Sequence, residues 1–136
     1  MFQITDTVKH LIFINVILFL AFISLLSEYK YELYLFYPES PLFRPWQVIT
    51  HMFMHGSINH ILFNMMSLFF IGPMMEHTLG SKKFLVYYLA CGLGGAMLHT
   101  FVNFISIHYL GNDAGMEIPM VGASGAVYGL LVAFAF

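Results

Sequence analysis

The chain has 136 residues, of which 60% are apolar, 18% are aromatic and only 9% are charged. A soluble domain carries about 25% charged residues. So few charged side chains cannot cover a water-exposed surface, and the composition predicts a membrane protein. Five Lys and Arg against seven Asp and Glu make no surface for phosphates, which excludes nucleic acid as a partner. The single cysteine, Cys91, excludes an internal disulfide framework and a cysteine-rich zinc site.

The charged residues leave four long apolar stretches, and each of them predicts a helical span. Lys9 before the first stretch is also typical of a secretory signal peptide, but no small-residue cleavage site follows it, so we expect a retained span. The sequence therefore predicts one domain over residues 1–136, an all-α, polytopic membrane helical bundle. Its expected spans cover residues 8–27, 57–77, 82–106 and 124–136.

Two longer loops, residues 28–56 and 107–123, separate the predicted spans. Lys9 precedes the first span, and Lys82 and Lys83 lie between the second and the third. The positive-inside rule then places the N-terminus in the cytoplasm and both loops on the outer side. The first loop is rich in Tyr and Pro and holds the single Trp, which predicts an irregular segment lying partly at the headgroup level.

The sequence stops at Phe136 within an apolar run. A helix end inside the hydrocarbon region would leave backbone carbonyls without partners. We therefore expect this sequence to be the incomplete part of a longer protein.

A glycine-flanked serine, Ser124, opens the fourth predicted span. Gly122 and Gly125 allow a sharp turn and close approach of the backbone. A serine in the first turn of a helix also lies near unpaired amides, which suits an oxyanion. The alternative is a packing face of small residues, with Gly125 and Gly129 one helical turn apart.

His60 and Asn64 are four residues apart and therefore share one face of the second predicted span. Both side chains can donate hydrogen bonds, and polar groups in a membrane are costly unless they serve a function or pair with one another. Two interpretations stay open at this point, a pair of oxyanion donors or an interhelical hydrogen-bonded pair.

Four other histidines raise the possibility of a metal site. His51 and His55 have the i, i+4 spacing that can hold a metal. No acidic residue lies between Glu39 and Glu76, however, and the remaining candidates, His99 and His108, each stand alone. We expect no metal and no cofactor.

Three motifs follow one another along the chain: Trp46 to Asn64, Glu76 to Ser81, and Gly122 to Gly129. Together they resemble the rhomboid family of intramembrane serine proteases. The stretch from Trp46 to Asn64 is similar to that family's first-loop and second-span signature, except that a frequent Trp-Arg pair reads Trp46-Gln47 here. Glu76-His-Thr-Leu-Gly-Ser resembles the junction after the second span. Gly122-Ala-Ser124-Gly-Ala-Val-Tyr-Gly resembles the nucleophile motif.

The resemblance implies a rhomboid-like core of six helices, of which this chain holds four. It implies Ser124 as the nucleophile, with His60 and Asn64 stabilising the oxyanion. Tyr128 would pack near the catalytic base, and His51 and His55 would be structural residues of the first loop. The family's catalytic histidine lies on the sixth span, so the resemblance places no general base in this chain.

The expected function is intramembrane serine proteolysis by a Ser-His dyad, with transmembrane proteins as substrates and the lipid bilayer as the surroundings. We expect an integral, multi-pass protein of the bacterial inner (plasma) membrane. A polypeptide of residues 1–136 alone is expected to be inactive. The alternatives are a rhomboid-like pseudoprotease that binds transmembrane helices without cleaving them, and a histidine-rich membrane metalloenzyme.

Overall fold

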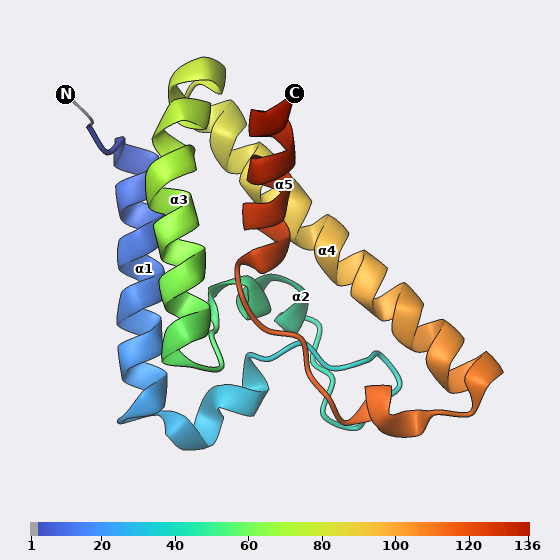
Figure 1. Ribbon diagram of the computed structural model, residues 1–136. Coiled ribbons are helices and arrows are strands. Elements are labelled where there is room, and N and C mark those ends of the chain that lie inside the picture. The colour runs from blue at the N-terminus through green and yellow to red at the C-terminus, as the bar shows by residue number, and fades with distance from the viewer. Residues whose placement is uncertain (1–2) are drawn as a thin grey trace.

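The computed structural model describes residues 3–136 as a helical bundle (Figure 1). No strand occurs in this part of the chain, and Leu35 and Met120 form a single antiparallel bridge. The predicted all-α bundle is confirmed. In chain order the elements are α1 (Asp6–Ile23), η1 (Ser27–Glu32), α2 (Gln47–Thr50), η2 (His51–Phe53), α3 (Ile58–Leu79), α4 (Ser81–Leu110), η3 (Asp113–Met116) and α5 (Ser124–Ala135).

Three of these helices, α1, α3 and α4, are long and apolar enough to cross a membrane. α4 has 30 residues, which corresponds to about 45 Å and exceeds the roughly 30 Å of hydrocarbon in a bilayer. A helix of that length is accommodated by tilting, and Figure 1 shows α4 inclined strongly to the pair α1 and α3. α5 is apolar but has only 12 residues.

The ends of α3 are set by local sequence. The Ser57 hydroxyl accepts a hydrogen bond from the amide of His60 at 3.2 Å, which caps the start of the helix. Gly80, with φ of 79°, ends it, and α4 begins at the next residue. This glycine can adopt a left-handed conformation that other residues avoid, so the chain reverses within one residue.

A buried carboxylate fixes the same end of α3 to α1. Glu76 is only 4% exposed, and it accepts hydrogen bonds from the hydroxyls of Thr5 and Ser81 and from the amides of Thr7 and Val8. A carboxylate at the first turn of a helix satisfies amides that have no partner within the helix. Glu76 therefore joins the starts of α1 and α4 to the end of α3.

The core lies between α1, α3, α4 and α5, together with η2. Gly95 of α4 faces Gly125 of α5, where a Cβ on Gly95 would come within 3.1 Å of the Gly125 Cα. Small residues thus let the two backbones approach closely. The buried apolar residues are Val8, Leu11, Phe19, Met52, Ile61, Met65, Leu68, Met75, Phe84, Tyr88, Ala123, Ala126, Val127 and Leu130.

Candidate active site

Ser124 is the first residue of α5 and is half-buried. Its hydroxyl makes no hydrogen bond to another residue in the described part of the chain. In Figure 1 the start of α5 lies level with the middle of α1 and α3, whereas η1 and η3 lie at the lower end of the bundle. Ser124 thus begins a helix that starts part of the way along the bundle.

Gly122 turns the backbone just before this serine. Its φ is 110°, and a Cβ at this position would lie 2.6 Å from the ring atoms Cε1 and Nε2 of His60. The same Cβ would lie 3.6 Å from the amide nitrogen of Asn64. Only glycine combines this backbone conformation with so close an approach. His60 and Asn64 of α3 therefore face the backbone that leads into Ser124.

The side chains of His60 and Asn64 do not hydrogen-bond to one another. Asn64 is 6% exposed, and its amide nitrogen is buried with no hydrogen-bond partner within residues 3–136. A buried donor without a partner costs roughly 1–3 kcal/mol. Within residues 3–136, the structure therefore shows no interhelical hydrogen bond from the Asn64 amide nitrogen.

His51 connects the first loop to the serine segment. Its Nδ1 donates to the carbonyl of Gln47 at 2.9 Å, and its own carbonyl accepts from the amide of Gly122 at 2.8 Å. The side chain is fully buried, and burial lowers the pKa of the His51 imidazole below its ordinary value. The family resemblance implied that His51 is a structural residue of the first loop, but nothing in the sequence predicted the bond between its carbonyl and the Gly122 amide.

The ring of His55 packs against the ring of His60. The two rings meet edge to face with centroids 5.1 Å apart, and His55 is 4% exposed. Burial, with a smaller contribution from the charge of His60, lowers the pKa of His55 to about 4. Its ring is therefore neutral at physiological pH. Neither ring nitrogen has a hydrogen-bond partner among the described residues.

The other two histidines considered as metal ligands, His99 and His108, have partners elsewhere. His99 is 3.1 Å from the Asn103 side chain on α4, and His108 is 3.3 Å from the Glu39 carboxylate. Within residues 3–136, no three His, Cys, Asp or Glu side chains are grouped so that they could hold a metal ion.

The remaining motif residues lie on different faces of α5. Gly125 and Gly129 pack against α4, where Gly129 contacts Cys91 and its carbonyl accepts from the Tyr87 hydroxyl at 2.9 Å. Tyr128 is 68% exposed. The glycine-rich motif thus has both properties considered from the sequence, because Gly122 faces His60 while the later glycines form a packing face.

A cavity of about 690 Å³ lies between the first loop and α4. None of the serine-site residues lines it, so its position does not mark the candidate site. Its lining is almost entirely apolar, and its residues include Leu35, Tyr37, Phe43, Val48, Leu93, Met97, Phe101 and Phe104.

The fold and the site define a polytopic helical membrane protein in which a helix-initial serine follows a glycine that faces a half-buried imidazole and a buried carboxamide. The model of the Rhomboid domain family matches residues 42–136. The chain belongs to the rhomboid family, and the resemblance found in its motifs is confirmed.

Curated relatives come from bacteria and from a plant. The chain is 33% identical over 91 residues to the rhomboid protease GluP of Bacillus subtilis, covering 67% of this chain and 15% of that protein. It is 34% identical over 91 residues to the rhomboid protease AarA of Providencia stuartii, covering 65% and 32%. It is 38% identical over 86 residues to RHOMBOID-like protein 1 of Arabidopsis thaliana, covering 63% and 19%. The chain thus spans well under half the length of these relatives.

Proposed function

We propose that this protein is an intramembrane serine endopeptidase that cleaves the transmembrane helices of other membrane proteins. Its relatives named rhomboid proteases support the general class. The observation that carries the proposal is the contact of Gly122 with His60, with the Asn64 amide alongside, two residues before Ser124. We infer from this arrangement that the Ser124 hydroxyl lies close to two hydrogen-bond donors.

In this proposal Ser124 is the nucleophile. Its oxygen attacks the carbonyl carbon of the scissile peptide bond, and the carbonyl oxygen becomes an oxyanion. His60, Asn64 and the backbone amide of Ser124 donate hydrogen bonds to this oxyanion. One such donor contributes on the order of 10²–10³ in rate in a soluble protease. The first amides of a helix have no partner within it, so the Ser124 amide is suited to this role.

The mechanism also needs a base that takes the proton from Ser124 and later gives it to the leaving amine. No histidine hydrogen-bonds to the Ser124 hydroxyl in the described part of the chain. As the resemblance to the family implies, the proposal assigns the base to a histidine on a later span, which would form a Ser-His dyad with Ser124. Water then attacks the acyl-enzyme ester, which releases the second product and restores the Ser124 hydroxyl.

The proposed substrates are transmembrane helices, whose carbonyls are locked in helical hydrogen bonds. Small or helix-breaking residues near the scissile bond should help, because the helix must unwind locally before Ser124 can attack. The lipid bilayer surrounds both proteins.

The proposed topology has the N-terminus in the cytoplasm. The hydrogen bonds from Thr5 and Ser81 to Glu76 hold Lys9, Lys82 and Lys83 at one end of the bundle. The loops that lead to Ser124 lie at the opposite end (Figure 1). Basic residues mark the cytoplasmic side, so the serine site opens outward. The bacterial relatives support placement in a bacterial inner membrane.

The test is serine labelling and cleavage by the full-length protein in liposomes that carry a transmembrane substrate. Wild-type protein should react with a fluorophosphonate and cleave the substrate. Ser124→Ala should abolish both, because the variant has no hydroxyl at position 124. Ser67→Ala, at a half-buried serine of α3, is the matched control and should retain both activities.

Each other outcome points to an alternative. Cleavage that survives Ser124→Ala would contradict the serine mechanism, and loss of that cleavage with a chelator would favour a metalloenzyme. A folded wild-type protein that binds transmembrane helices but neither reacts nor cleaves would be a rhomboid-like pseudoprotease.

A further inference from the structure

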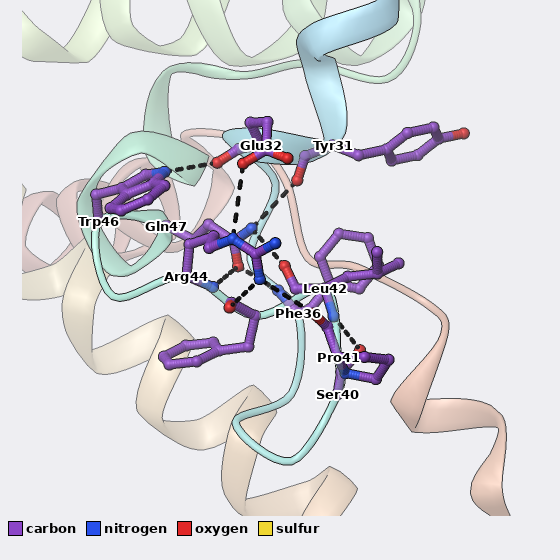
Figure 2. A network of polar contacts seen from close by, with 10 residues as sticks. Tyr31, Glu32, Phe36, Ser40, Pro41, Leu42, Arg44, Trp46 and Gln47 are labelled. Carbon is purple, nitrogen blue, oxygen red and sulfur yellow. Dashed lines mark hydrogen bonds and ion pairs between the residues drawn. The ribbon is translucent and has the colours of Figure 1, made fainter.

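One buried side chain organises the first loop. Gln47 is fully buried, and its side-chain oxygen accepts hydrogen bonds from the amides of Phe36 at 3.3 Å and Arg44 at 3.0 Å. Its side-chain nitrogen donates to the carbonyls of Tyr31 at 3.1 Å and Leu42 at 3.0 Å. Figure 2 shows these bonds converging on the one carboxamide. All four of its hydrogen-bonding positions are used.

These bonds substitute for secondary structure. The four backbone groups lie between residues 31 and 44, where no strand and no α-helix supplies partners. A buried backbone group without a partner is costly. Gln47 therefore determines the path of this segment, and its removal would leave four backbone groups to find other partners.

A second set of bonds closes the outer side of the loop. The indole nitrogen of Trp46 donates to the carbonyl of Glu32 at 2.8 Å, and the Arg44 guanidinium donates to the carbonyls of Pro41 and Phe43 at 3.0 and 2.9 Å (Figure 2). These groups are more exposed than Gln47, so their bonds contribute less. In the family's frequent Trp-Arg pair, the Trp is thus kept as Trp46 and the Arg is replaced by the buried amide of Gln47, while a guanidinium lies three residues earlier at Arg44.

Two routes of hydrogen bonds lead from Gln47 to the serine segment. The first passes through Phe36 to its neighbour Leu35, whose amide and carbonyl bond to the carbonyl and amide of Met120 at 3.0 and 2.8 Å. The second begins at the main-chain carbonyl of Gln47, which accepts from the His51 ring, and continues from the main-chain carbonyl of His51 to the Gly122 amide. Both routes end on the three residues that begin at Met120, just before Ser124.

We propose that Gln47 is a positioning residue for Ser124, because it holds the first loop in the conformation that fixes the backbone of residues 120–122. This inference rests on the proposed role of Ser124 as the nucleophile. It requires that loosening the loop at Gln47 loosens the serine segment, although Gln47 and Ser124 are far apart in sequence.

The experiment is hydrogen–deuterium exchange on the full-length protein, comparing wild type with Gln47→Met and Gln47→Glu. Methionine has a similar length and makes none of the four bonds. Glutamate retains oxygens for the two accepting bonds. Gln3→Met, at an exposed glutamine, is the matched control.

In Gln47→Met the amides of Met120 and Gly122 should exchange roughly tenfold faster or more, since losing one net hydrogen bond of about 1 kcal/mol already gives a severalfold change. Exchange in α3 should not change. Gln47→Glu should also accelerate exchange, because its second oxygen would face the carbonyls of Tyr31 and Leu42 with no proton to donate, and Gln3→Met should not. Unchanged exchange at residues 120–122 in both Gln47 variants would overturn the proposal, as would a uniform increase over α1, α3 and α4 in both.

Kinetics separate this inference from the proposed function. At a temperature where all variants are folded, Gln47→Met should lower kcat and the rate of Ser124 labelling by roughly tenfold, with KM nearly unchanged, because misplacing a reacting group affects the transition state. If wild-type protein neither cleaves nor reacts, the proposed function fails while the exchange result stands by itself. If wild type cleaves and Gln47→Met matches it in kcat and exchange, only the positioning role fails.

Discussion

The buried polar groups at the two ends of α3 differ in whether they have hydrogen-bond partners. At one end Glu76 accepts hydrogen bonds from two hydroxyls and two backbone amides. Near the other end, the Asn64 amide nitrogen is buried without a partner among the described residues, and so are both ring nitrogens of His55, which lies in the segment just before the helix. The end of α3 therefore carries a fully satisfied polar cluster, and unsatisfied polar groups lie at and just before its start.

This difference separates stability from function. A buried donor without a partner costs roughly 1–3 kcal/mol, and such groups persist in proteins mainly where a ligand or a reaction uses them. Substitutions at the Glu76 end should therefore lower the free energy of unfolding and leave catalysis intact. Substitutions at the His60 and Asn64 end should do the reverse.

The largest effect on activity among the scaffold positions is expected from Gly122→Ala. The new Cβ would collide with the His60 ring and displace it from the oxyanion position, so we expect cleavage to fall by roughly 10²-fold or more. Gly80→Ala is the matched control, because Gly80 also has a positive φ but no atom lies within 4 Å of its Cβ position. Both variants bear the backbone cost, about 1–2 kcal/mol. Equal cleavage by the two would mean that the contact with His60 is unimportant.

Glu76→Ala should give the largest loss of stability. It leaves the amides of Thr7 and Val8 and the hydroxyls of Thr5 and Ser81 without their acceptor. We expect the free energy of unfolding in detergent to fall by about 3 kcal/mol, since hydrogen bonds to a charged group are each worth roughly 1.5–3 kcal/mol. Cleavage per folded molecule should stay the same. Glu117→Ala, at an exposed loop position, should change neither quantity, and a large drop in kcat for Glu76→Ala would contradict the separation.

Acid should destabilise the His55 end. The pKa of His55 is about 4 in the folded protein, below the unfolded value of about 6.5. Below pH 6.5 the unfolded chain therefore binds a proton that the folded chain does not, and stability falls as pH falls toward 4. The loss should reach about 2 kcal/mol at pH 5. It is measured as the melting temperature in detergent between pH 7.5 and 5.

His55→Gln removes the titrating group and should flatten this pH dependence. The same titration of His77→Gln, at an exposed histidine of α3, controls for the change in net charge. A wild-type melting temperature that stays constant from pH 7.5 to 5 would show that His55 is not held neutral by burial.

Much of this arrangement could be predicted from the sequence, because it depends on local patterns. The apolar stretches predicted the helical bundle, with α3 at Ile58–Leu79 against the expected 57–77 and α4 at Ser81–Leu110 against 82–106. The i, i+4 spacing placed His60 and Asn64 on one face of a helix. The glycines around Ser124 predicted a sharp turn just before a helix.

The tertiary contacts could not be predicted in the same way. The contact of Gly122 with His60 and the bond from its amide to the His51 carbonyl join segments more than 60 residues apart, and no spacing rule relates them. From the sequence, Gln47 was only a departure from the family's frequent Trp-Arg pair. Its four hydrogen bonds could not be predicted, because its partners lie in an irregular loop. The first predicted span, 8–27, differs from α1 (Asp6–Ile23) because the chain leaves the α-helix after Ile23 and continues into η1.

The most direct test of the separation compares Asn64→Ala with Asn15→Ala by kcat and melting temperature. Both are buried helical asparagines, but the Asn15 amide already donates to the Leu11 carbonyl at 2.8 Å. Asn64→Ala should lower kcat roughly tenfold or more without lowering the melting temperature, because it removes a donor that no described residue uses. Asn15→Ala should leave kcat unchanged. A melting temperature several degrees lower for Asn64→Ala, with kcat intact, would show that Asn64 is a structural residue and would contradict the account.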